Sequence, residues 1–198
     1  MHTTYLMVAL AGRDSGIEVE KEAMAEVRSD WPEGTGRLHI AVIGNSYAVN
    51  QVELIYKHFS RFAKNFTMFA QIECEVLAYT HSKHCKHFYE YADALQELKP
   101  DVTFIVQRYF ASLQIAVPRS SVDPTTEELI VYMEKLLPHS SLFFIEDAIP
   151  SFNTNAFSLL NDMLFRQMPA DKINERLVND NGVSRARTRI LKMANHCQ

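Results

Sequence analysis

The sequence predicts an α/β fold in which helices cover both faces of a mostly parallel β-sheet. Three observations lead to this prediction. Continuous apolar runs recur along the chain, and each is short enough to be a buried strand. Amphipathic segments with helical spacing separate these runs. The chain has 198 residues and is 47% hydrophobic, so we expect one globular domain with a substantial core.

The start of the chain is expected to be a lead-in over residues 1–37, followed by one domain over 38–198. The apolar stretch 5–12 is short and has no basic segment before it, so we interpret it as a packed strand or turn rather than a signal peptide. Helical spacing of apolar residues predicts a helix over 16–31. The sequence PEGTG (32–36) then interrupts the chain before the first strong strand.

Four strands alternate with helices in the rest of the chain. The strands are predicted over 38–44, 72–79, 102–109 and 141–147. Helices are predicted over 47–63, 86–98 and 124–138, with one or two more in the tail from Pro169 around Asn181 and Gly182. Alternation of this kind gives right-handed βαβ units and parallel strands. We therefore expect a three-layer αβα sandwich with a flavodoxin-like strand order.

Ligands of such sheets bind outside the carboxyl ends of the strands, which selects the candidate residues. Glu146 and Asp147 end the fourth strand; paired carboxylates can do acid/base work, but we expect these two to anchor a loop. His39, Asp101 and His139 lie at the opposite end and are poor candidates for a site. The residues expected at the carboxyl ends are Gly44, Asn45, Ser46, the segment 79–87, Gln107, Arg108, Tyr109, Glu146 and Asp147.

Ser46 lies where the first strong strand meets the first amphipathic helix. Gly44 allows the backbone to turn there. A serine at this point can expose its hydroxyl group and direct its own N–H at a developing oxyanion. Alternatively, Ser46 or Asn45 only caps the helix. A third interpretation is phosphate or nucleotide binding at this turn, but the sequence has neither of the glycine signatures G-x-x-x-x-G-K-[ST] and G-x-G-x-x-G.

Three segments resemble a known family. IAVIGNSYAVNQ (40–51), LKPDVTFIVQRYF (98–110) and DKINERLVNDNGVSRARTRI (171–190) resemble the SGNH-type domain at the C-terminus of nematode acyltransferase-3 proteins. The resemblance covers most of residues 36–195. It implies an SGNH-hydrolase-like sheet with Ser46 as nucleophile and its N–H as oxyanion donor. Asn45 replaces the usual Asp of the G-D-S motif.

The same resemblance suggests further contacts and also a missing part. It implies oxyanion or substrate contacts from Gln107 and Arg108, and Asn50 follows Ser46 by one helical turn. SGNH enzymes also need a final strand and a D-x-x-H loop, whose His is the general base. No Asp of this sequence has a His three residues later. We therefore expect a domain that lacks its last strand and has weak or no activity.

The segment around Cys85 allows several interpretations. His81 or His84 could replace the missing base. A zinc site could be formed by His81, His84, Cys85 and His87, although one short cluster is weak support. Cys74 and Cys85 could instead form a disulfide, which suits an extracytoplasmic domain. Cys197 is expected, from the resemblance, to pair with a cysteine further downstream. No metal or cofactor is assigned.

The resemblance implies transfer or hydrolysis of an O-acyl ester, with acetyl as the expected group, through Ser46. The expected partners are a carbohydrate or lipid acceptor and an integral-membrane acyltransferase domain of the parent protein, with this domain on the extracytoplasmic or luminal side. The alternative is a non-catalytic SGNH-like binding module or a fragment that never acts alone. No stretch of the chain approaches the ~18 apolar residues of a membrane span. The net charge is -4 without any Lys/Arg block, so nucleic-acid binding is not expected.

Overall fold

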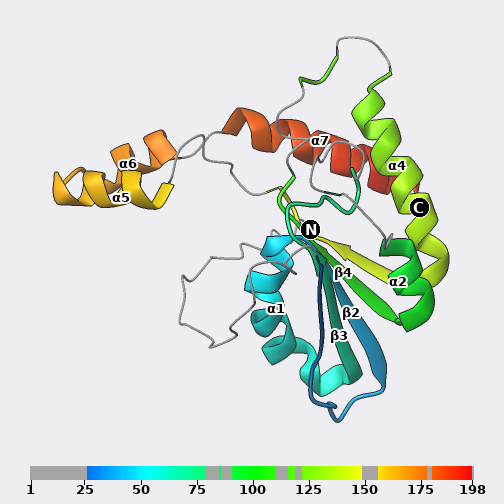
Figure 1. Ribbon diagram of the computed structural model, residues 1–198. Helices are drawn as coiled ribbons and strands as arrows, with labels where there is room; N and C mark the ends of the chain where they lie inside the picture. The colour runs from blue at the N-terminus through cyan, green and yellow to red at the C-terminus, as the bar shows by residue number, and fades with distance from the viewer. Residues whose placement is uncertain are drawn as a thin grey trace.

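The computed structural model describes residues 26–78, 85, 91–109, 116–118, 122–148, 156–177 and 180–197. Five strands form one sheet in the order β1-β3-β2-β4-β5 (Figure 1). They are β1 (Glu26–Asp30), β2 (Leu38–Gly44), β3 (Ala63–Gln71), β4 (Val102–Val106) and β5 (Leu142–Ile145). β1 runs antiparallel to β3, and every other pair is parallel. The predicted mostly parallel α/β fold is confirmed, and β3, β2, β4 and β5 follow the beginning of the flavodoxin-like order.

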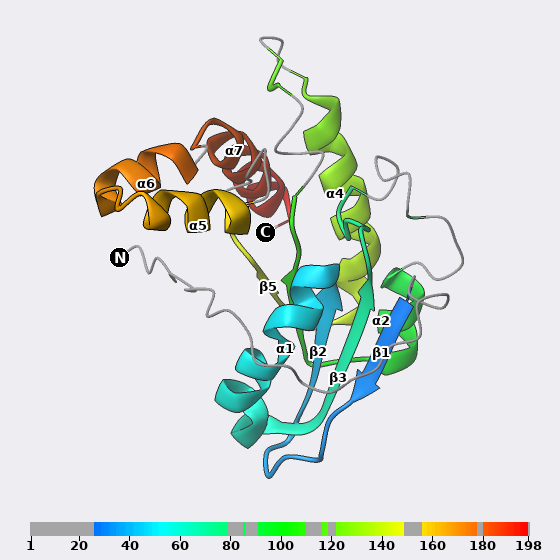
Figure 2. The ribbon, with the colours of Figure 1, turned by 60° about the vertical axis from the view of Figure 1, so that its left-hand side comes forward.

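Helices lie on both faces of this sheet, as Figures 1 and 2 show. The helices are α1 (Ser46–Phe59), α2 (Tyr91–Leu98), α4 (Pro124–Leu136), α5 (Ala156–Phe165), α6 (Ala170–Leu177) and α7 (Asp180–His196), with 3₁₀ turns at Ser60–Phe62 and Leu137–His139. α1 packs on one face against β2 and β3. α2 and α4 lie on the other face, and α7 packs along α4. α5 and α6 pair as a hairpin that extends away from the sheet (Figure 2).

The core is divided by the sheet into two clusters, because successive residues of a strand point to opposite faces. On the α1 side, Ile40 and Val42 of β2 pack with Ala48, Val52 and Ile55 of the helix. On the other side, Ala41 and Ile43 pack in the cluster that contains α2, α4 and α7. Both faces of β2 are therefore covered, which explains why its sequence is a continuous apolar run rather than an alternating one.

The helix predicted over 16–31 is wrong where the structure describes it. Glu26–Asp30 form β1, whose residues pair one by one with β3 from Glu26 opposite Gln71 to Asp30 opposite Thr67. The prediction rested on the helical spacing of Val19, Ala23, Met24 and Val27. Local spacing carries no information about β3, the pairing partner, which lies some forty residues later. The first three of these residues, like the stretch 5–12, lie outside the described residues.

The second strand was predicted in the wrong place. β3 occupies Ala63–Gln71, whereas residues 72–78 form a buried turn and loop after it. Glu73 has a φ of 61°, a left-handed conformation that no regular strand contains, and the Cys74 N–H donates to the Gln71 carbonyl across the turn. The helix predicted over 47–63 was also too long, because Ala63 is already the first residue of β3.

The remaining elements differ from the prediction mainly in length. The third and fourth predicted strands shorten to β4 and β5, and the tail contains the helices α6 and α7. Asn181 and Gly182 lie in the first turn of α7. The hairpin helix α5 was not predicted. Among the described residues, no helix is long and apolar enough to cross a membrane.

Candidate functional site

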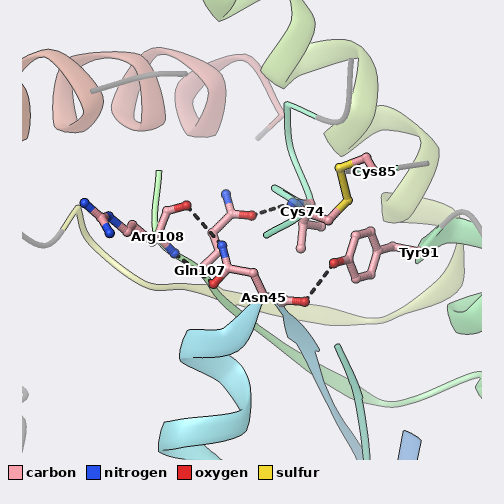
Figure 3. Close-up of a disulfide and its surroundings, with 8 residues drawn as sticks. Asn45, Cys74, Cys85, Tyr91, Gln107 and Arg108 are labelled. Atoms are coloured by element: carbon pink, nitrogen blue, oxygen red, sulfur yellow. Dashed lines mark hydrogen bonds between the residues drawn. A yellow bond between two sulfur atoms is a disulfide. The ribbon is translucent and has the colours of Figure 1, made fainter. Parts of the chain in front are cut away.

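Gly44 ends β2 at a point where no side chain fits. A Cβ atom placed there would lie 1.8 Å from the carbonyl oxygen of Val106 on β4. The Tyr91 hydroxyl of α2 donates a hydrogen bond of 2.7 Å to the Gly44 carbonyl (Figure 3). Glycine is therefore required by the close approach of β4, and the backbone at this turn is fixed between β4 and α2.

Asn45 both caps α1 and joins it to β4. Its Oδ1 accepts hydrogen bonds from the N–H of Tyr47 (3.1 Å) and the N–H of Arg108 (3.2 Å), and its Nδ2 donates to the Arg108 carbonyl (3.1 Å; Figure 3). The side chain is fully buried. These three bonds use both ends of the amide, and they tie the start of α1 to the residue that follows β4 by two positions.

Ser46 is the first residue of α1 and is not its cap, because Asn45 has that role. The Ser46 side chain is half-buried. Neither its hydroxyl nor its N–H bonds to another residue in the described part of the chain. An unbonded N–H at the positive end of a helix dipole is suited to bind a developing negative charge. The turn thus presents a hydroxyl and an amide donor on the same residue.

Gln107 and Arg108 lie beside this turn but have different environments. The Gln107 side chain is fully buried, and its Oε1 accepts a hydrogen bond of 2.5 Å from the Val76 N–H. It therefore fastens the loop after β3 to the end of β4. The Arg108 side chain is half-buried and points away from Gln107 and from the disulfide (Figure 3). Of the two side chains, that of Arg108 is therefore the one that reaches solvent.

Asn50 is exposed on α1, one turn after Ser46. Its side chain makes no hydrogen bond to any residue that the structure describes. It therefore has no anchoring contact with any described loop.

A disulfide joins Cys74 to Cys85, with their Cα atoms 5.1 Å apart. It lies on the side of the Gly44–Asn45 turn where Tyr91 lies (Figure 3). Both sulfurs are bonded to each other, so Cys85 is not a metal ligand in this state. His81, His84 and His87 lie outside the described residues, and the described ones contain no group of three or more His, Cys, Asp or Glu side chains able to hold a metal ion. Cys197 is a free thiol whose pKa is raised by burial and by the charge of Glu134.

Glu146 lies at the carboxyl end of β5, and the sequence did not reveal its hydrogen bonds. Its Oε1 accepts a hydrogen bond of 2.9 Å from Gln51 Nε2 on α1. Its N–H donates to the Ile105 carbonyl, and its carbonyl accepts from the Tyr109 hydroxyl at 2.9 Å. Burial raises the pKa of the carboxyl to about 7, even though the bond from Gln51 acts to lower it. The only sequence signal was the position of Glu146 directly after a buried strand.

Two Asp–Arg pairs fix α7 at this same end of the sheet. Asp147 binds Arg187 at 2.6 Å on the surface. Asp123, directly before α4, binds Arg189 at 2.7 Å and also accepts from the Thr126 hydroxyl. Both members of the Asp123–Arg189 pair are buried. Asp147 thus anchors a loop to a helix, as expected for one member of the Glu146–Asp147 pair.

The sheet is mostly parallel, and the Gly-Asn-Ser turn lies at the carboxyl ends of its strands. In open α/β proteins of this class, ligands bind outside those strand ends. The family model described as the SGNH domain fused to AT3 domains matches residues 20–198. This chain therefore belongs to the SGNH domain family that occurs fused to AT3, or acyltransferase-3, domains. No curated protein matches the chain.

Proposed function

We propose that this chain is the SGNH domain of an acyltransferase-3 protein of the nematode C-terminal type, and that Ser46 attacks an O-acyl ester. The observation that carries the proposal is the arrangement at the start of α1. Asn45 supplies the helix cap, and among the described residues the Ser46 hydroxyl and N–H have no partner. An ordinary capping serine would have its oxygen bonded to the helix.

The proposed reaction proceeds through an acyl-enzyme. The Ser46 Oγ forms a bond to the carbonyl carbon, and the Ser46 N–H stabilises the oxyanion. The alcohol then leaves, and an acceptor hydroxyl or water takes the acyl group from Oγ. Arg108, whose backbone is held by Asn45, is the proposed substrate contact, and Asn50 a second one. Gln107 is proposed to support the site by holding the loop after β3.

The proton of the Ser46 hydroxyl needs a base, and the 198 residues contain no D-x-x-H sequence. Loss of one member of a catalytic triad commonly lowers the rate by several orders of magnitude. We therefore propose that this chain turns over esters weakly or not at all without a base from elsewhere. A non-catalytic SGNH-like binding module is the second candidate, favoured by the same observation.

The proposed setting is the extracytoplasmic or luminal side of a membrane, beside the acyltransferase domain of the parent protein. The acceptor would be a carbohydrate or a lipid, and acetyl the transferred group. The disulfide between Cys74 and Cys85 supports an oxidising compartment, because disulfides rarely persist in the reducing cytosol.

Hydrolysis of an acetyl ester by the purified chain tests the proposal, with and without added imidazole as an external base. We expect Ser46→Ala to abolish hydrolysis above background, and imidazole to raise only the rate that depends on Ser46. Ser60→Ala, at the other end of α1, is the matched control and should keep the wild-type rate. Equal rates for Ser46→Ala and wild type under both conditions would reject catalysis by Ser46 and favour the binding module.

A further inference from the structure

A carboxyl–amide pair links the helix of Ser46 to the last strand of the sheet. Glu146 Oε1 accepts a hydrogen bond of 2.9 Å from Gln51 Nε2. Two further atoms of this pair are buried: the other carboxyl oxygen, Glu146 Oε2, and the single side-chain oxygen of Gln51, Oε1. Neither has a hydrogen-bond partner among the described residues. Buried acceptors without donors cost free energy, and the described residues leave this pair short of one donor.

A single proton on Glu146 would supply a donor for both oxygens. A neutral carboxyl group has one O–H donor and one carbonyl acceptor, and a primary amide has N–H donors and one carbonyl acceptor. The two groups can therefore pair through two hydrogen bonds that run in opposite directions. The bond from Gln51 to Glu146 already exists. The second would run from the Glu146 Oε2 hydroxyl to Gln51 Oε1.

We propose that, at mildly acidic pH, Glu146 carries a proton in the native protein and, through Gln51, acts as a positioning residue for Ser46. The surroundings of the carboxyl favour its neutral form. Among the described groups, α1 presents the uncharged Gln51, and the adjacent Asp147, which is paired with Arg187, adds a negative charge. The backbone N–H of Gln107, after β4, acts in the opposite direction and lowers the pKa of the carboxyl, but burial outweighs it. The Tyr109 hydroxyl bonds to the backbone carbonyl of Glu146 and brings no charge. Burial raises the pKa of Glu146 to about 7.

The pair can position Ser46 because α1 is one continuous helix of 14 residues. Asn45 holds its first turn to β4, and Glu146 holds its second turn, through Gln51, to the end of β5. Two anchors on two strands fix both the rotation of the helix and its position along its axis. Loss of the proton would set two unpaired oxygens against each other and loosen the second anchor. The use of this positioning in catalysis rests on the proposed function, but the positioning of α1 by the protonated pair does not.

Nuclear magnetic resonance of the full chain tests the proposal without requiring catalysis. The carboxyl carbon of Glu146 should titrate with a midpoint near 7, about 2.5 units above the ordinary value of 4.5. The backbone amide resonance of Ser46 should shift with the same midpoint. Glu146→Gln forms an amide–amide pair with the same two hydrogen bonds, so the Ser46 amide should no longer titrate there. Glu53→Gln, an exposed position on the same helix, should leave both titrations unchanged.

Three results would overturn the proposal: a Glu146 midpoint near 4.5, a Ser46 amide that ignores the Glu146 titration, or a midpoint that depends on the concentration of potassium ions, which would indicate a bound cation. The wild-type titrations alone decide the question if Glu146→Gln fails to fold. Coupled titration with equal ester hydrolysis by wild type and Ser46→Ala would uphold the positioning role and reject the proposed function.

Discussion

At the scale of single residues, Asn45 explains why this turn reads Gly-Asn-Ser. Its amide accepts two N–H groups on one side and donates to the Arg108 carbonyl on the other. An aspartate could accept the same two hydrogen bonds, but its second oxygen would face that carbonyl with no donor between them. The end of β4 therefore requires an amide at this position, whereas the cap of α1 alone would accept either residue.

We predict that Asn45→Ala lowers the free energy of unfolding by about 2–4 kcal/mol, because it removes a helix cap and leaves the Arg108 backbone groups without their partner. Urea unfolding followed by circular dichroism measures the loss. Asn50→Ala, an exposed change on the same helix, should stay within about 0.5 kcal/mol of wild type. A loss below about 1 kcal/mol for Asn45→Ala would contradict the clamp between α1 and β4.

At the scale of elements, apolar runs predicted strands correctly where the buried segment is also paired in the sheet. β2 and β4 are continuous apolar runs because helices cover both faces of the sheet, and their positions were predicted to within a few residues. The loop 72–78 is as apolar as a strand because Cys74, Val76, Leu77 and Ala78 belong to the core. Hydrophobicity reports burial, so it could not show that this segment has no strand partner. Conversely, β1 owes its conformation to β3, a contact that local spacing does not reveal.

The site was predictable to the same extent. Topology alone placed Ser46 and Arg108 at the carboxyl ends of neighbouring strands. In the structure, Asn45, next to Ser46, is hydrogen-bonded to the backbone of Arg108. The bond between Gln51 and Glu146 joins residues 95 positions apart. The sequence gives no local sign of such a contact, because the helix face and the strand end meet only after the sheet has formed.

The helix α7 is fixed by two arginines that differ in burial. The Arg189–Asp123 pair is nearly inaccessible to solvent, whereas both members of the Arg187–Asp147 pair are about half exposed. We predict that Arg189→Met lowers the free energy of unfolding by about 3–5 kcal/mol, since it leaves the buried Asp123 carboxylate without its partner. Arg187→Met is the matched control and should cost less than about 1 kcal/mol. Urea unfolding of both variants decides, and equal losses would show that burial of the pair has no effect.

At the scale of the whole molecule, the disulfide restricts the unfolded chain. It links residues 11 positions apart, and a loop of that size corresponds to about 3 kcal/mol in the chain-entropy model. We predict that reduction lowers the free energy of unfolding by about 2–4 kcal/mol in urea unfolding with and without a thiol reductant. Cys197→Ser, which removes the free thiol, should show the same sensitivity to the reductant. An unchanged unfolding curve after complete reduction would contradict this prediction.

The pH dependence of stability follows from buried groups with opposite shifts. Burial raises the pKa of Glu146 from 4.5 to about 7, so the native state binds more protons than the unfolded state between these values. This stability is fully present below about pH 4.5 and is lost as the pH rises through about 7, an effect of up to about 3 kcal/mol. For Asp123, desolvation acts to raise the pKa, but hydrogen bonds from Arg189 and Thr126 outweigh it and leave the pKa lowered. Its contribution is present above the unfolded value of about 4 and is lost as the pH falls through the lowered one.

Burial also lowers the pKa of His39. The free energy of unfolding that His39 contributes is therefore lost as the pH falls below about 6.5, and this loss opposes part of the gain from Glu146. Because the shift of Glu146 is the large one, we predict that the free energy of unfolding is greatest near pH 5 and falls toward pH 8. Urea unfolding from pH 3 to 8.5 measures the profile. Glu146→Gln should remove the fall between about pH 5 and 8, because its amide has no proton to lose, whereas Glu53→Gln should retain it. Equal profiles for wild type and Glu146→Gln would show that Glu146 is ionised in the native state without cost.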